Sequence, residues 1–199
     1  RRSPLHAVLT VLILGVGIGA VTLMFSAINT SVLRPLPYPE PDQLVWLWKA
    51  SDRVPQNSVS YEDFRDYRNG VEAFQELAAT QLFSPRPLVS GAEESERVDA
   101  SLVTPNFFDV MGVTPVQGRT FRWDEAVLGG AAVAIISDAF WQSRFGGDPG
   151  VLGQTMALDG TPTEIVGIMP PDFEFRRPVQ VWLPTREGSG ATLGRGNNN

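Results

Sequence analysis

Residues 7–28 read AVLTVLILGVGIGAVTLMFSAI, and 16 of these 22 residues are apolar. No Asp, Glu, Lys or Arg occurs from residue 3 to residue 33. At about 1.5 Å of rise per residue, a helix of this length spans roughly 33 Å, enough for a hydrocarbon core of about 30 Å. The stretch therefore predicts a transmembrane helix, within an N-terminal segment that we assign to residues 1–33.

Two other interpretations of this stretch are a buried core helix and a secretory signal peptide. Helices of globular proteins rarely run this far without a charged residue to face water. Arg1 and Arg2 fit the basic start of a signal peptide, but the apolar run exceeds the usual 7 to 15 residues. Phe25 also puts a bulky side chain where cleavage prefers a small one. An uncleaved membrane anchor is favoured.

The glycines of this span predict a packing face. Gly15, Gly17 and Gly19 resemble a dinucleotide-binding loop, but such a loop leaves a strand and enters a helix, which an uninterrupted apolar span does not provide. Gly15 and Gly19 are four residues apart, so a second membrane helix can approach them closely. Glycine is also common in membrane helices without such a role.

The charge distribution predicts the orientation of the chain. Arg1 and Arg2 precede the span, and the remaining 14 of the 16 basic residues follow it among 22 acidic residues. The positive-inside rule then places the N-terminus in the cytoplasm, although a long domain crosses largely regardless of its charge. Because the chain starts with Arg and ends in a Gly, Arg and Asn tail, we expect a fragment.

Residues 34–41 predict a stiff connector between membrane and domain. Prolines occupy alternate positions here and favour an extended backbone. We assign Arg34, Pro35, Pro37 and Tyr38 to this connector.

The composition excludes several functions. The chain has a net charge of -6 and one lysine, Lys49, which argues against binding nucleic acid. It has no cysteine, so disulfides, thiol catalysis and zinc–thiolate sites are absent.

The rest of the chain predicts alternating helices and strands. We expect a buried strand at 43–50. From Ser60 to Leu77 we expect one amphipathic helix or, with a break at Gly70, a pair of helices. Strands follow at 78–89 and 96–103, then a short helix at 106–111 with Thr104 as N-cap and Gly112 just after its end.

The second half carries stronger local signals. A buried strand at 131–136 precedes a helix capped by Ser137 or Asp138 and ended by Gly146. Asp159-Gly160 predicts a hairpin between 154–158 and 163–169, and 179–183 predicts a last strand.

Seven short motifs, in this order, resemble one known family. They are LGVGIGA at 14–20, VLRPLPYP at 32–39, TPNFFDVMGV at 104–113, GRTF at 118–121, WQSRFGGDP at 141–149 and LDG at 158–160 with IVGIMPP at 165–171. Together they resemble the first membrane helix and periplasmic core domain of MacB/FtsX-type ABC transporter permeases. The likeness is greatest to the duplicated orphan permeases that lack a fused ATPase.

The resemblance implies an α+β fold with one N-terminal transmembrane helix and a two-lobed periplasmic domain. It implies a βαββαβ-type, porter-like lobe at 42–111, a smaller β-rich inserted lobe at 112–171, and a return segment and tail at 172–199. The family closes its first lobe with a further strand and helix and then has more membrane helices. This chain ends before them, so we expect its sheet to be incomplete.

Catalysis is not expected. The one histidine, His6, lies beside the span, so no histidine-based triad or metal site is available in the domain. Carboxylate pairs such as Asp63/Asp66 and Asp124/Glu125 suit glycosidase chemistry but are also usual on solvated surfaces. We predict no enzyme activity, no catalytic residue, no metal and no cofactor.

Aromatic residues offer one further alternative. An apolar substrate groove is one interpretation of Trp46, Trp48, Phe107, Phe108 and Trp141, but we favour core packing, because each falls on a predicted helix or strand. Arg144 with Gly146 and Gly147 suggests a contact loop or, as we prefer, a helix C-cap.

We therefore expect a permease fragment in the bacterial inner membrane, with its N-terminus cytoplasmic and its domain periplasmic. The resemblance implies a cytoplasmic ABC ATPase that binds the ATP, a homodimer or pseudo-dimer of permease halves, membrane lipid and a periplasmic partner. The implied function couples ATP hydrolysis to export or mechanotransmission. The alternative is a membrane-anchored interaction or sensor domain, or an FtsX-like regulator of cell-wall hydrolases, without transport.

Overall fold

The structure, a computed structural model, describes residues 4–28, 43–47, 59, 61–81, 85–90, 95–175 and 177–186. The chain divides into two compact units, residues 1–36 and residues 37–199. Each unit is described by itself.

The first unit contains one described helix, α1 (Pro4–Ile28), of 25 residues. Its side chains are described at residues 8, 9 and 11–25, and all of these are exposed. Over the described positions, no helix has both the length and the apolar character that crossing a membrane requires. α1 thus confirms that residues 7–28 are helical. Its role as a membrane span stays a prediction.

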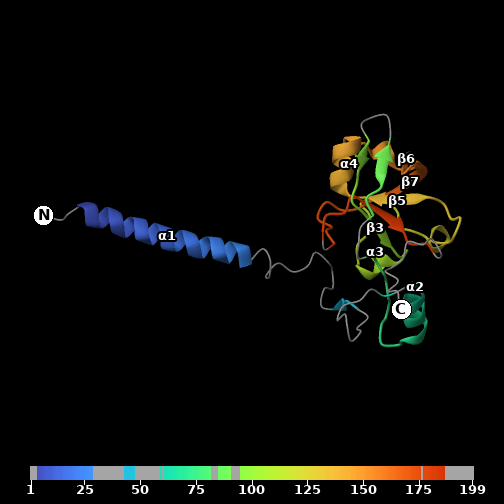
Figure 1. The fold of residues 1–199 in the computed structure, drawn as a ribbon, viewed down its shortest axis with the longest axis horizontal. Helices are drawn as coiled ribbons and strands as arrows, with labels where there is room; N and C mark the ends of the chain where they lie inside the picture. Colours follow the sequence, from blue (N-terminus) through green and yellow to red (C-terminus); the bar gives the residue numbers. More distant parts are fainter. Residues whose placement is uncertain are drawn as a thin grey trace, which may run out of the picture. The chain divides into compact units, whose positions relative to one another are not determined.

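The second unit is built on a mixed sheet (Figure 1). Eight strands of the described residues form it: β1 (Leu88–Ser90), β2 (Glu96–Arg97), β3 (Ala100–Val103), β4 (Gln117–Gly118), β5 (Val133–Ile136), β6 (Thr155–Leu158), β7 (Thr161–Ile168) and β8 (Val181–Pro184). Their order is β2-β1-β6-β7-β5-β8-β3, with β4 paired to β7. The β5/β7 and β3/β8 pairs are parallel, and the other pairs are antiparallel.

Side chains of successive strand residues point to opposite faces, so the sheet carries two cores. On β5, Ala134 and Ile136 face one core, and Val133 and Ile135 face the other. The aliphatic cluster consists of Val89, Val98, Ala100, Ala134, Ile136, Phe140, Val151, Met156, Leu158, Ile165, Ile168 and Val181. The aromatic cluster consists of Val103, Phe107, Phe108, Met111, Phe121, Val133, Ile135, Val166, Met169, Phe173, Val179 and Trp182.

One helix covers each face. Phe140 of α4 (Asp138–Phe145) belongs to the aliphatic cluster, and Phe107 and Phe108 of α3 (Phe107–Val110) belong to the aromatic cluster. The Ser137 Oγ accepts a hydrogen bond from the Phe140 N–H at 3.1 Å, and Gly146 ends α4 with φ 61°. The Ser137 alternative for the N-cap and the Gly146 end are thus confirmed.

The predicted hairpin is also confirmed. β6 and β7 pair across Asp159 and Gly160, whose φ angles are 47° and 79°. Positive φ at both central residues is the geometry that favours Asp-Gly in a two-residue hairpin turn.

Several predicted elements differ in the structure. Residues 43–47 are not a buried strand: they pair with no described strand, and Val45, Trp46 and Leu47 are exposed. Residues 48–50 lie outside the described residues, as does the predicted helix start at Ser60. The helix itself is α2 (Tyr61–Gly70), so Gly70 is its end. Residues 71–77 are not helical, and the expected continuation toward Leu77 is wrong.

The other differences concern pairing and caps. Within the range 78–89, where a strand was predicted, the described residues form only the start of β1 and an isolated bridge between Thr80 and Val103, and residues 82–84 lie outside the described residues. Asn106 rather than Thr104 is the N-cap of α3. The Thr104 Oγ1 instead accepts the Ala79 N–H at 3.0 Å. Gly112 follows α3 with φ 67°, as predicted.

Strand pairing joins the residue ranges that we assigned to different lobes. β1, from the range 42–111, pairs with β6, from the range 112–171. β3, also from the first range, pairs with β8 from the return segment. The strands thus share one sheet, and the division into two lobes stays a prediction.

Candidate functional site

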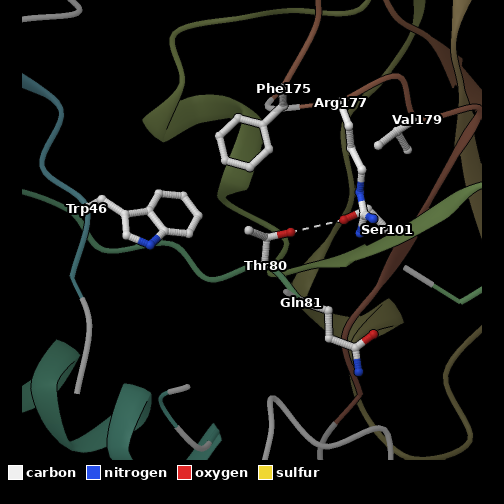
Figure 2. Close-up of a pocket in the computed structure, with 7 residues that line it drawn as sticks. All are labelled: Trp46, Thr80, Gln81, Ser101, Phe175, Arg177 and Val179. Carbon is white, nitrogen blue, oxygen red and sulfur yellow. Dashed lines mark hydrogen bonds between the residues drawn. The ribbon is translucent and has the colours of Figure 1, made fainter. Parts of the chain in front are cut away.

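A small pocket opens beside the aromatic face of the sheet, with a volume of about 250 Å³ (Figure 2). We call it the Trp46–Phe175 pocket. Its lining comes from residues far apart in sequence: Trp46, Thr80, Gln81, Ser101, Phe175, Arg177 and Val179.

Two aromatic rings form the wall of the pocket. The Trp46 and Phe175 ring centroids are 5.6 Å apart, with planes tilted by 33°. Phe175 also meets Phe107 edge to face at 5.1 Å, so the wall continues into the aromatic cluster. Trp46 is 40% exposed, which leaves a large part of the indole open to a ligand. The wall is therefore an outward extension of the core.

Two hydroxyl groups form a polar patch in the pocket. Thr80 Oγ1 and Ser101 Oγ are hydrogen-bonded at 3.0 Å, and Ser101 is only 6% exposed. Backbone bonds hold the two residues in register, because the Gln81 N–H donates to the Leu102 carbonyl and the Thr104 N–H to the Ala79 carbonyl, each at 2.9 Å. The hydroxyl pair is thus fixed on the edge of β3.

Arg177 completes the pocket with a cation. A bridge between Phe175 and Arg177, closed by the Arg177 N–H donating to the Phe175 carbonyl at 2.6 Å, sets the two side chains. Figure 2 shows the Trp46 indole on one side of the pocket and the Arg177 side chain on the other. The pocket therefore combines an aromatic wall, hydroxyls and a guanidinium.

A second polar feature is an ion pair in the turn that precedes β5. Glu125 is 5% exposed and lies in the 3₁₀ helix η3 (Trp123–Glu125). Its carboxylate accepts two hydrogen bonds from Arg119, at 2.6 and 3.1 Å, and one from the Arg122 N–H at 2.8 Å. The hydrogen bond to Glu125 raises the pKa of Arg119 above its ordinary value.

This ion pair bears on the carboxylate pairs considered for catalysis. Glu125 is engaged by Arg119, and Asp124 is exposed with its carboxylate 3.5 Å from Arg122. Asp66 is exposed on α2, with Asp63 three residues before it. Across the described residues, no group of three His, Cys, Asp or Glu side chains is placed to hold a metal ion.

Of the predicted site residues, the structure describes the two glycines of α1 but not the connector residues. A Cβ atom added to Gly15, Gly17 or Gly19 meets nothing within 4 Å in this chain, so the packing face of Gly15 and Gly19 stays a prediction. Arg34, Pro35, Pro37 and Tyr38 lie outside the described residues.

The five aromatic residues considered for a substrate groove lie in different environments. Phe107 and Phe108 are buried, which confirms core packing for them. Trp141 is half-buried against the aliphatic cluster and donates its indole N–H to the Asp148 carbonyl at 2.8 Å. Trp46 lines the pocket, and Trp48 lies outside the described residues. The C-cap interpretation near Arg144 is confirmed by Gly146.

Sequence reasoning missed the pocket partners of Trp46. Phe175, Arg177 and the Thr80–Ser101 pair carry no motif of their own, because each is an ordinary residue in a turn or at a strand edge. The available signal was the aromatic character of the 43–47 segment. The groove interpretation of Trp46 used this signal, but we favoured core packing on a strand, which is wrong for Trp46 because it is exposed and lines the pocket.

Two of the quoted motifs meet in space. Gly118 pairs with Gly167, joining the segment GRTF to the segment IVGIMPP. A Cβ atom on Gly167 would lie 2.5 Å from the Arg119 carbonyl oxygen, and one on Gly118, whose φ is 80°, would overlap the Val166 carbonyl oxygen. Both glycines are required by this close approach of β4 to β7.

Comparison with known families assigns the chain to one of them. The model of the family described as "MacB-like periplasmic core domain" matches residues 7–198. The chain belongs to this family. The family description points to an extracytoplasmic domain of a membrane protein, as found in ABC-type transporter permeases.

Curated relatives share part of the chain. The macrolide export ATP-binding/permease protein MacB of Burkholderia pseudomallei (strain 1710b) is 31% identical over 96 residues, which is 47% of this chain and 14% of the relative. The MacB protein of Burkholderia thailandensis (strain ATCC 700388 / DSM 13276 / CCUG 48851 / CIP 106301 / E264) is also 31% identical over 96 residues. The match therefore spans about a seventh of each relative.

Two solved structures share the fold. The extracellular domain of the noncanonic ABC-type transporter YknZ from Gram-positive bacteria has a TM-score of 0.52 and 22% identity, covering 64% of this chain and 63% of that one. The periplasmic region of MacB from Actinobacillus actinomycetemcomitans has a TM-score of 0.51 and 16% identity, covering 67% and 59%. The α+β fold with a mixed sheet is thus that of MacB periplasmic domains.

Proposed function

We propose that the chain is the first membrane helix and extracytoplasmic domain of an ABC transporter permease subunit. In this proposal the domain couples ATP hydrolysis by a cytoplasmic ABC ATPase to export or mechanotransmission across the inner membrane. The observation that carries the proposal is that the family match starts at residue 7 and continues to residue 198, so the apolar helix and the folded unit belong together.

The membrane helix is supported by sequence and local structure. Residues 7–28 contain no charged side chain and lie within α1, whose backbone satisfies its own hydrogen bonds as a lipid environment demands. We propose that this helix spans the inner membrane with the N-terminus in the cytoplasm. Residues 34–41 then connect it to the periplasmic domain.

The domain works by binding and moving rather than by chemistry in this proposal. Glu125 is engaged in a structural ion pair, and the described carboxylates form no cluster suited to a metal ion. We propose that ATP is bound by a partner subunit and that this chain carries no catalytic residue. The two predicted lobes would contact cargo, a second permease half or a periplasmic partner.

The cargo is a separate question. The Burkholderia relatives are named for macrolide export. The Trp46–Phe175 pocket, at about 250 Å³, is smaller than the roughly 300 to 1,000 Å³ of sites that enclose drug-sized ligands. We therefore do not propose a macrolide as the ligand of this pocket.

The sequence that follows residue 199 in the gene tests the permease proposal. Further hydrophobic spans and a neighbouring ATPase gene are expected. A cytoplasmic signalling domain after the described unit would contradict it and favour a membrane-anchored sensor instead.

Helix packing can be tested with single cysteines, because the chain has none of its own. At about 100° per residue, Gly15 and Gly19 share one face of α1, while Gly17 lies on the opposite face. In a homodimer that packs through the small-residue face, Gly15→Cys and Gly19→Cys should form disulfide-linked dimers in membranes.

Gly17→Cys is the matched control, because it places the same side chain in the same helix on the other face. Equal cross-linking of all three variants would indicate random collision. Cross-linking through Gly17 alone would contradict the proposed packing face.

A further inference from the structure

We propose that the Trp46–Phe175 pocket binds a small ligand consisting of one planar apolar ring and a carboxylate. The proposal goes beyond the proposed function, because such binding requires neither an ATPase nor a membrane. Its failure would leave the permease proposal unchanged.

The volume sets the size of the ligand. The pocket holds about 250 Å³. An apolar cavity of about 150 Å³ accepts benzene, while sites for drug-sized ligands start at roughly 300 Å³. A single ring with a short acidic side chain fits between these limits.

The wall sets the shape of the apolar part. Trp46 and Phe175 are tilted by 33° with centroids 5.6 Å apart, so they present two neighbouring aromatic surfaces. Phe175 is held from behind by the buried Phe107, which meets it edge to face at 5.1 Å. A flat ring gains from offset or edge-to-face contact with such surfaces, whereas a branched aliphatic group contacts them less completely.

The polar groups set the charge of the ligand. The Arg177 guanidinium carries five N–H donors in a planar fork that matches a carboxylate, so it can add a ligand to the contacts it already makes. In the Thr80–Ser101 pair, one hydroxyl donates to the other, and the acceptor's own O–H remains available. Among the described lining residues, Arg177 is the one charged side chain and no carboxylate is present, so an anion is favoured over a neutral or cationic ligand.

The burial of the polar groups makes the pocket selective for ligands that carry both a ring and an acceptor. Ser101 is 6% exposed and is held by backbone bonds on both sides of Thr80, so its hydroxyl stays in place when a ligand enters. A ligand without an acceptor would leave these polar groups without their water, which costs binding energy. A ligand without a ring would leave Trp46 and Phe175 in contact with water.

The test is calorimetric titration of the whole chain, residues 1–199, with three probes that separate the two features. 3-Phenylpropionate has the ring and the carboxylate, propionate lacks the ring, and 3-phenylpropan-1-ol lacks the charge. We expect 3-phenylpropionate to bind about tenfold or more tightly than either control, as the loss of a charge-assisted contact or an aromatic surface implies. No measurable binding, or equal binding of all three probes, would overturn the proposal.

Variants locate the binding. Arg177→Gln and Phe175→Leu should each weaken 3-phenylpropionate binding by about tenfold. Arg122→Gln is the matched control, because it removes an exposed arginine outside the pocket, whose side chain is 63% exposed. Undiminished binding in both pocket variants, or an equal loss in Arg122→Gln, would refute the site. Thermal unfolding of each variant verifies that the chain is folded.

The same chemistry occurs in a free small acid and at the end of a peptide with C-terminal Phe. The peptide Ala-Ala-Ala-Phe and its C-terminal amide distinguish these sources. Tighter binding of the acid peptide than of 3-phenylpropionate would assign the pocket to a chain end, and weaker binding to a free small acid. Equal binding of the peptide and its amide would contradict carboxylate recognition for the peptide.

Discussion

The two faces of the sheet are packed by different kinds of side chain. Under α4, the aliphatic cluster contains one buried aromatic ring, Phe140, among Val, Ile, Leu, Met and Ala. Under α3, rings dominate, and Phe108 alone meets Phe107, Phe121, Phe173 and Trp182 at centroid distances of 5.4 to 6.1 Å.

The two faces also differ at their edges. The aromatic contacts continue from Phe107 through Phe175 to the exposed Trp46, whereas Trp141 and Phe145 pack against the aliphatic cluster. Among the described residues, the aromatic face therefore leads to a surface pocket. A candidate site in such a domain is found where an aromatic core reaches the surface.

The largest loss of stability is expected from a substitution in the aromatic cluster. Phe108→Ala removes a fully buried ring with four aromatic neighbours and should lower the free energy of unfolding by about 3–5 kcal/mol. Urea unfolding measures the loss.

Phe140→Ala is the counterpart on the aliphatic face. It should cost less, because within the described part of the chain Phe140 has one ring contact, to Phe145 at 5.9 Å, and aliphatic neighbours can close part of the cavity. A cost for Phe140→Ala above that for Phe108→Ala would contradict the comparison.

A smaller effect is expected at the turn that holds Phe121 in the aromatic cluster. Phe121 lies between Arg119 and Glu125, so their ion pair fastens this turn. Glu125→Gln removes the charge that two arginine contacts use, and we expect a loss of about 1–3 kcal/mol in the free energy of unfolding.

Asp124→Asn is the control for this turn. It changes the neighbouring carboxylate, whose side chain is 70% exposed, and should cost less than about 1 kcal/mol. If the two substitutions destabilise equally in urea, the buried ion pair does not have the role assigned to it.

The smallest loss of stability is expected at the N-cap of α4, the helix that covers the aliphatic cluster. Ser137→Ala removes the N-cap of α4 and should cost about 1 kcal/mol. Ser143→Ala, within the same helix, should be nearly neutral, because the Ser143 hydroxyl only donates to the Phe140 carbonyl of the preceding turn. Thermal unfolding compares them, and an equal loss would argue against the cap.

Local signals account for what the sequence predicted correctly. Ser137 and Gly146 determine the ends of α4, and Asp159-Gly160 determines the hairpin, because each acts within a few residues of itself. The family motifs then gave the overall α+β fold.

Long-range pairing accounts for what sequence reasoning missed. β4 consists of two residues that pair with a strand far along the chain, and the Trp46–Phe175 pocket depends on turns that meet only in the folded unit. The 43–47 segment reads as a strand because its residues are apolar and aromatic. Strand formation, however, also needs a partner strand.

The location of the folded unit is the central claim, and a topology reporter tests it most directly. Alkaline phosphatase, which is active only outside the cytoplasm, would be fused after Leu183 in the intact protein. We expect full enzymatic signal from this fusion and none from the same reporter placed before residue 1. Signal from the N-terminal fusion and silence after Leu183 would contradict the account.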